Sequence, residues 1–119
     1  MANIKQSMEE VLTLDGAMCA SLVDSNSGMI LGQAGSGVDM EVAAAGNTEV
    51  VKAKLKTMRS LGLNDVIEDI LITLGKHYHI IRPMGRKEGL FLYVVLDKTK
   101  SNLAMARRKV LDIERELIV

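Results

Sequence analysis

Gly75-Lys76 stands between two runs of strand-forming residues and constrains the fold more than any other feature of the chain. The stretch VIEDILITLGKHYHIIRPM predicts two β-strands joined by a two-residue turn, with Gly75 at the first central position of a type II′ turn. This register sets side chains opposite one another across the hairpin. The expected pairs are Leu74 with His77, Ile72 with His79, Ile70 with Ile81, and Asp69 with Arg82 as an ion pair. The chain is therefore expected to contain an antiparallel sheet.

Hydrophobic periodicity predicts the elements on either side of this hairpin. Helical spacing of apolar residues occurs in 3–14, in 38–61 and after Leu103, where Ser101 or Thr99 is the expected N-cap. The expected strands cover 17–23, 29–34, about 67–74, the run from 77 to Pro83, and 90–96. The order α-β-β-α-β-β-β-α indicates one α/β domain of the α+β type over 1–119. Its core would be a five-stranded antiparallel sheet flanked by helices.

The long helix expected at 38–61 is apolar around much of its circumference, so it needs two covers. One stripe contains Met40, Ala44, Val51, Leu55 and Met58 and is expected to face the sheet. A second face consists mostly of small side chains: Val42, Ala45, Gly46, Glu49 and Ala53. Glycine inside a helix costs about 1 kcal/mol of stability relative to alanine. Close packing of another helix against this position would explain why residue 46 is a glycine.

The segment GQAGSG, residues 32 to 37, has the G-x-x-x-x-G spacing of a phosphate-binding loop. A working loop continues with a lysine and a hydroxyl residue, which bind phosphate and metal. Val38 and Asp39 occupy those positions here, and a carboxylate at 39 would repel phosphate. The segment is therefore interpreted as a structural joint between a strand and the long helix, where glycine permits positive φ angles.

Composition excludes several classes of function. Fifteen basic and fifteen acidic residues cancel, and only three residues are aromatic, so the chain lacks the basic excess and stacking surface of a nucleic-acid binder. The apolar run 90–96 is far shorter than the roughly 20 residues of a membrane-spanning helix. Cys19 is the single cysteine, and MANIKQSMEE lacks the apolar core of a secretory signal. A cytoplasmic protein without membrane insertion is expected.

Three groups of residues are candidates for chemical sites. His77 and His79 share a strand face, but two ligands are insufficient for a metal, so the pair is interpreted as hairpin surface or a pH-sensitive patch. Cys19 is expected to be a small buried residue rather than a nucleophile. No nucleophile, base and orienting group can be assembled, so no catalytic residue, cofactor or metal is predicted.

Basic residues cluster on two of the expected helices: Lys52, Lys54, Lys56 and Arg59 on one, and Arg107, Arg108 and Lys109 on the other. A solvated helix surface is the preferred interpretation, helped by an i,i+4 pair between Arg108 and Asp112. The alternative is a docking surface for an acidic partner.

The order of elements resembles the Roadblock family, which includes the dynein roadblock light chain and bacterial regulators of Ras-like GTPases. The likeness is carried by DKTKSNLAMARRKVLDIERELIV, especially Asn102 to Arg107, by LFLYVVLD, by HYHIIRPM and by the junction from Gly37 to Ala45. It covers nearly the whole chain.

The resemblance implies a profilin- or longin-like fold and a homodimer, in which the second helix packs against its mate and the third strand pairs with its counterpart. Carried onto this sequence, it implies an interface at Val42, Ala45, Gly46, Glu49, Ala53, Ile67, Asp69, Leu71 and Thr73. Glu49 would then pair with Lys52 or Lys56 of the second subunit. The implied partner is a Ras-like small GTPase or another protein subunit of a motor or signalling complex.

Two further functions remain open from the sequence. Related single-sheet folds can hold ligands in a cleft, so a small-molecule-sensing module is the alternative to a non-enzymatic dimeric adaptor. An enzyme is disfavoured, because the family carries no common catalytic set that transfers to this chain.

Overall fold

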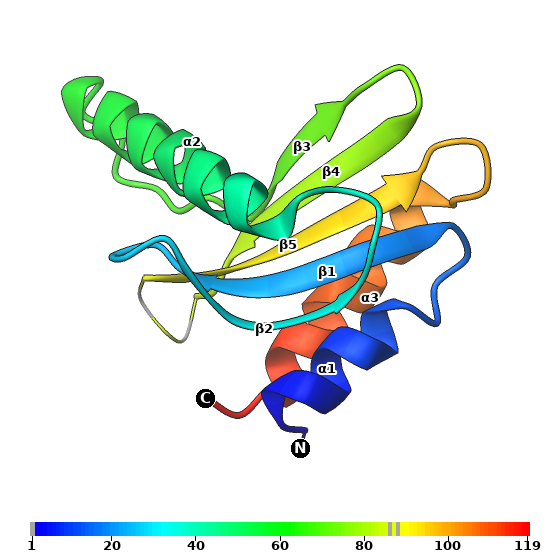
Figure 1. Cartoon of the computed structure of the whole chain (residues 1–119). Coiled ribbons are helices and arrows are strands. Elements are labelled where there is room, and N and C mark those ends of the chain that lie inside the picture. The colour runs from blue at the N-terminus through cyan, green and yellow to red at the C-terminus, as the bar shows by residue number, and fades with distance from the viewer. Residues whose placement is uncertain (1, 86, 88) are drawn as a thin grey trace.

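The computed structural model describes residues 2–85, 87 and 89–119. Its elements follow the predicted order α-β-β-α-β-β-β-α (Figure 1). They are α1 (Ile4–Val11), β1 (Ala17–Asp24), β2 (Met29–Gly35), α2 (Met40–Ser60), β3 (Ile70–Thr73), β4 (His77–Pro83), β5 (Leu90–Asp97) and α3 (Leu103–Glu116). Within the described residues, no helix has the length and apolar character that crossing a bilayer requires.

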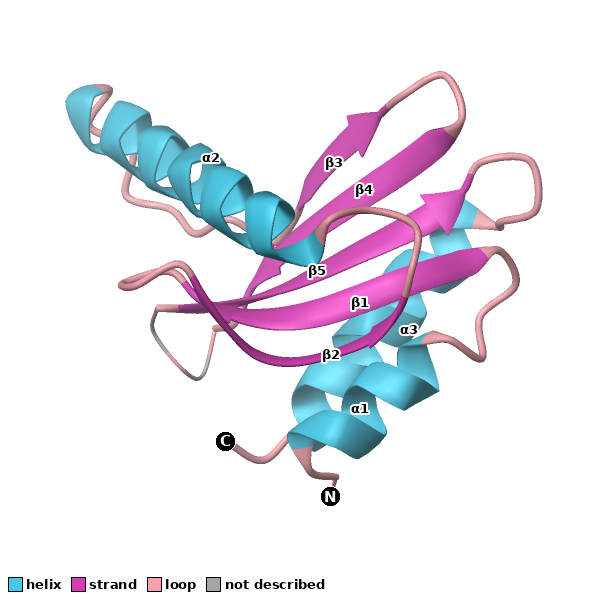
Figure 2. Cartoon of the chain, in the orientation of Figure 1, coloured by secondary structure: helices cyan, strands magenta, loops and turns pink. Residues whose placement is uncertain are grey.

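The five strands form one antiparallel sheet in the order β2-β1-β5-β4-β3. β5 lies at the centre, as its unbroken apolar run predicts, and β2 and β3 are the two edges. Figure 2 shows α1 and α3 side by side on one face of the sheet and α2 on the other.

Each face of the sheet has its own hydrophobic core. On the first face, Met8 of α1 and Val110 of α3 pack over Leu22, Val94 and their neighbours. On the second face, Ala44 and Val51 of α2 pack with Cys19, Phe91 and Tyr93. The sheet is therefore buried between helices only where α2 covers it, and α2 contacts chiefly β1 and β2.

The β3–β4 hairpin confirms the predicted register but not the predicted turn. Ile70 pairs with Ile81, Ile72 pairs with His79, and the Leu74 backbone N–H donates to the His77 carbonyl oxygen at 2.8 Å. Gly75 does not have the positive φ that a type II′ turn requires at this position, so the turn is of another kind. The two-residue loop and the alternation of side chains were enough to predict the β3–β4 register, although the predicted turn type is wrong.

The joint between β2 and α2 depends on two glycines of the segment GQAGSG. Gly35 and Gly37 have φ angles of +80° and +133°, and a Cβ at Gly35 would collide with the backbone of Met18 and Cys19. Asp39 then caps α2, and its carboxylate accepts a hydrogen bond from the Val42 N–H at 3.2 Å. The N-terminus of α2, where a phosphate would have to bind, is thus already occupied by the carboxylate of Asp39.

The N-cap of α3 is Asn102, whereas Ser101 or Thr99 was predicted. The Asn102 side chain accepts from the Met105 N–H at 3.1 Å. Both predicted hydroxyls are engaged by Asp97, because Ser101 donates to its carbonyl oxygen at 2.6 Å and Thr99 donates to its carboxylate at 2.7 Å.

A candidate self-association surface

Helix α2 buries one narrow stripe and leaves most of its surface exposed. Ala44, Thr48, Val51 and Met58 are its buried residues, and the Thr48 hydroxyl donates to the Ala44 carbonyl oxygen at 2.7 Å. Leu55, predicted to belong to the same stripe, is 38 % exposed. Its neighbours in the stripe, Val51 and Met58, are buried, and Leu55 lines a surface hollow that leaves part of its side chain open to solvent.

The predicted small-residue face of α2 is open to solvent in the single chain. We use this name for Val42, Ala45, Gly46, Glu49 and Ala53, all of which are at least partly exposed. Val42 is 68 % exposed, and a Cβ built on Gly46 would meet nothing within 4 Å. The described part of the chain therefore offers no cover for this face, and the close approach expected at Gly46 does not come from within the chain.

Strand β3 is shorter than predicted. The predicted strand begins near Ile67, whereas the ladder with β4 runs from Ile70 to Thr73. Ile67 and Asp69 thus precede the strand, and Leu71 and Thr73 are exposed residues within it. β3 has β4 on one side only, so its outer edge is free in the single chain.

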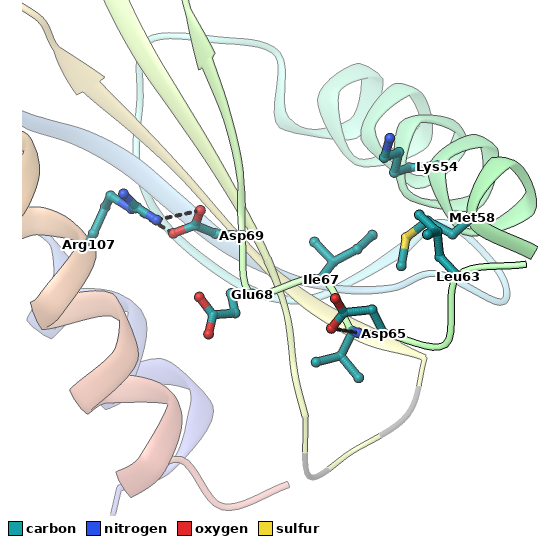
Figure 3. A pocket seen from close by; sticks show the side chains of 9 residues that line it. Lys54, Met58, Leu63, Asp65, Ile67, Glu68, Asp69 and Arg107 are labelled. Atoms are coloured by element: carbon teal, nitrogen blue, oxygen red, sulfur yellow. Dashed lines mark hydrogen bonds and ion pairs between the residues drawn. The ribbon is translucent and has the colours of Figure 1, made fainter. Parts of the chain in front are cut away.

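An ion pair explains the late start of β3, and it corrects the predicted pairing of Asp69 with Arg82. Asp69 accepts two hydrogen bonds from Arg107 of α3, at 2.8 and 2.9 Å (Figure 3). Arg82 instead donates to Glu114 at 2.6 Å and to the Glu68 carbonyl oxygen at 2.9 Å. The chain before Ile70 is therefore held by the side chains of Arg107 of α3 and Arg82 of β4 rather than by a backbone ladder with β4.

The Asp69–Arg107 pair lies at the side of a surface hollow of about 560 Å³. Figure 3 shows Lys54, Met58 and Leu63 on the α2 side of this hollow and Asp69 with Arg107 on the α3 side. The hydrogen bonds and charge of Asp69 raise the pKa of Arg107 above its ordinary value. Leu63 and the nearby Leu61 and Val66 are exposed, and no pattern in the sequence predicted this.

A polar chain beneath α2 was also missed. The Tyr93 hydroxyl lies 3.0 Å from His79 Nδ1, and the nearby side chain of Asn47 of α2 partly offsets the rise in the Tyr93 pKa that burial causes. Asn47 adjoins Gly46, so this chain connects β4 and β5 to the helix that carries the small-residue face. A lone asparagine among small helical residues has no periodic signal that could have identified it.

The two histidines stack at a centroid distance of 5.8 Å with an interplanar angle of 20°. Burial, and then the nearby His77, lower the pKa of His79. His79 Nε2 is buried and has no hydrogen-bond partner in the described structure. No group of three metal-ligating side chains occurs among the described residues, and Cys19 is fully buried as predicted.

The basic residues of α3 are largely used within the chain. Arg107 holds Asp69, Lys109 donates to Glu10 of α1 at 2.9 Å, and Arg108 forms the predicted i,i+4 pair with Asp112 at 3.3 Å. The α2 residues Lys52, Lys54, Lys56 and Arg59 are exposed and form no ion pair with another described residue.

Comparison with solved structures identifies the fold. The chain superposes on a Roadblock/LC7 domain from Streptomyces avermitilis with a TM-score of 0.83 and 13% identity, over 97% of this chain and 94% of that one. Myxococcus xanthus MglB gives 0.76 and 19%, over 95% and 86%, and the gliding protein MglB from Thermus thermophilus gives 0.70 and 20%, over 93% and 87%. A further MglB structure is described as having a tetrameric arrangement. No protein-family model and no curated protein matches the chain.

These similarities show that the chain has the Roadblock/LC7 fold, as the order of its elements predicted.

Proposed function

We propose that this protein is a non-enzymatic homodimeric adaptor or regulator, which binds a Ras-like small GTPase or scaffolds a larger motor or signalling complex. The observation that carries the proposal is the small-residue face of α2, exposed along the helix with no cover from the described chain. The shared fold with MglB and with Roadblock/LC7 domains supports the same class of function.

A second α2 is the partner that fits this face best. Ala45, Gly46 and Ala53 have side chains short enough for two helix backbones to approach closely. Burial of Val42 would remove apolar area from water, at about 25 cal/mol per Å². The MglB neighbour with a tetrameric arrangement supports self-association in a protein of this fold.

The free edge of β3 supports the same dimer. Its sequence, ILIT, contains no charge or proline that would discourage pairing with another strand. Pairing of β3 with its counterpart would satisfy this edge and join the two sheets into one. Leu71 and Thr73 would then lie at the junction, with Ile67 and Asp69 in the segment leading to it.

Charge completes the proposed interface. Glu49 is exposed among the small residues, and Lys52 and Lys56 follow it along the same helix. In an antiparallel arrangement of two α2 helices, Glu49 of one subunit would approach Lys52 or Lys56 of the partner subunit. Such a pair contributes modestly at an exposed site, so it would set alignment more than affinity.

The dimer is tested by Gly46→Leu, measured by light scattering and sedimentation equilibrium. Leucine should strengthen the isolated helix by about 0.8–1 kcal/mol, and its Cβ meets nothing within the chain. The variant is therefore expected to fold normally yet shift the protein towards monomer. Ala104→Leu places the same bulk on an exposed alanine of α3 and should leave the dimer intact. A Gly46→Leu protein that remains as dimeric as wild type would remove α2 from the interface.

Partner binding needs a separate experiment. In this proposal the nucleotide belongs to the partner, since the carboxylate of Asp39 already occupies the N-terminus of α2. A purified candidate small GTPase should bind the dimer more tightly in one nucleotide state than in the other, as its switch loops are ordered differently. Equal affinity for the GTP-analogue and GDP forms would contradict a regulator that reads the GTPase state.

A hollow beside α2 supports the alternative function, a small-molecule-sensing module. Val51, Leu55, Val66 and Phe91 help to line a space of about 510 Å³ between α2 and the start of β5. Such a size suits a small apolar ligand. Native mass spectrometry of the purified protein would reveal a bound molecule of defined mass, and a bare protein mass would leave the adaptor proposal as the sole candidate.

A further inference from the structure

The second edge of the sheet, β2, is as open as β3 but lies at the opposite end of the strand order. β2 pairs with β1 on one side, and no backbone partner on its other side occurs among the described residues. Its sequence, MILGQAG, has no charged residue and no proline. Met29 and Leu31 are 65 % and 46 % exposed. The edge therefore lacks the charges and proline that often discourage strand addition, although its register with β1 shifts at Leu31, which has no cross-strand partner.

A hollow flanks this edge on the α1 face of the sheet. It has a volume of about 540 Å³ and is lined by Ile4, Leu31 and Ile118, with Lys5 among its polar residues. Gly32 contributes to its shape, because a Cβ there would collide with the Ile4 side chain. α1 therefore sits directly against the strand, and the aliphatic residues lie beside the free edge.

A second hollow flanks the edge on the α2 face. It has a volume of about 480 Å³ and is lined by Met29, Ile30, Gln33 and Glu41. Glu41 is exposed in the first turn of α2 and forms no ion pair with another described residue. This side of the edge therefore carries one exposed carboxylate, whereas the only charged residue among those described around the first hollow is Lys5.

We propose that the β2 edge binds an extended segment of a partner protein, in which aliphatic side chains alternate with basic ones. Successive side chains of an added strand point to opposite faces of the sheet. One set would enter the aliphatic hollow around Leu31 and Ile118, and the other would reach Glu41. The backbone of the segment would pair with the free N–H and C=O groups of β2.

A second copy of β2 fits this edge less well than a basic segment does. β2 has no basic residue to meet Glu41, and a second copy would bring its own Glu41 to the same contact. The site lies at the opposite end of the sheet from β3, so it does not rest on the proposed dimer. The protein could therefore form the proposed dimer and bind a segment at the β2 edge at the same time.

The test uses an acetylated and amidated heptapeptide of alternating valine and lysine, titrated into the full chain and followed by ¹⁵N amide shifts. Saturable shifts are expected in residues 28–35. Met29→Lys or Leu31→Lys should weaken binding about tenfold or more, because a lysine on an edge opposes strand addition. Met105→Lys is the matched control, since Met105 of α3 is also 65 % exposed, and it should bind as wild type does.

A charge exchange tests the contact with Glu41. A peptide of alternating valine and glutamate should bind wild type weakly, and Glu41→Lys should reverse the preference between the two peptides. The proposal is overturned by an absence of saturable shifts up to millimolar peptide, or by shifts that map to 70–73. It is equally overturned if the protein alone forms assemblies that Met29→Lys abolishes, because a second copy would then occupy the edge.

Discussion

Arg107 of α3 donates two hydrogen bonds to the carboxylate of Asp69, which lies 38 positions earlier in the sequence. Asp69 is 12 % exposed in its side chain and Arg107 is 48 % exposed, so the pair lies at the boundary between surface and interior. It attaches the segment before β3 to the helix layer on the opposite side from α2. The position of the free β3 edge therefore depends on a contact made by a different layer of the fold.

Replacing Arg107 with methionine should loosen this attachment. Because the guanidinium is partly exposed, the expected loss in the free energy of unfolding is only about 0.5–1 kcal/mol. Amide hydrogen exchange in 66–69 should become faster, while exchange in β5 should not change. Arg108→Met is the control, since its i,i+4 pair with Asp112 is solvated and should contribute no more than about 0.5 kcal/mol. Equal effects of the two variants would show that the Asp69 contact does not hold the segment.

The features that could be predicted from the sequence are those with a short-range or periodic signal. The register from Ile70 to Ile81 follows from strict alternation across a two-residue loop, and the central position of β5 follows from its unbroken apolar run. Cys19, in a strand of small and apolar residues, is buried as expected.

The features that could not be predicted are choices among competing polar partners. Arg82 had a nearby carboxylate across the hairpin, yet Glu114 and the Glu68 carbonyl group hold it, because a long side chain selects its partner in three dimensions. The contacts of Tyr93 with His79 and Asn47 bring three elements together and have no pattern along the chain. The candidate interface on α2 was identified by the size of its residues, but whether a partner covers it is a property of the assembly.

His79 makes stability depend on pH in a defined direction. Its pKa in the folded protein is lowered by burial and by His77, from an ordinary value of 6.5. The unfolded chain therefore binds more protons, and the folded protein should lose stability as the pH falls below about 6.5. Melting temperatures at pH 7.5 and 5.5 should differ less in His79→Gln than in wild type. His77→Gln should also reduce the difference, since it removes one of the two causes.

Cys19 should resist thiol reagents in the native protein. Burial raises the pKa of its thiol, and the side chain is fully enclosed in the core under α2. The thiolate is the reactive form, so modification by a disulfide reagent should require opening of the structure. The rate should rise in step with the unfolded fraction as denaturant is added. Rapid stoichiometric reaction in buffer alone would contradict burial of this residue.

Gly35 and Gly75 should respond in opposite ways to substitution by alanine. Gly35 has a φ of +80°, and its new Cβ would collide with the backbone of β1, so Gly35→Ala should cost roughly 2 kcal/mol or more. Gly75 lacks a positive φ and has open space around it, so Gly75→Ala should be neutral or stabilise by about 0.4–1 kcal/mol. Urea titrations of both variants give the two values directly. A large loss of stability in Gly75→Ala would indicate that Gly75 has the positive φ of a type II′ turn after all. A small loss in Gly35→Ala would indicate that the joint before α2 does not need a left-handed backbone at Gly35.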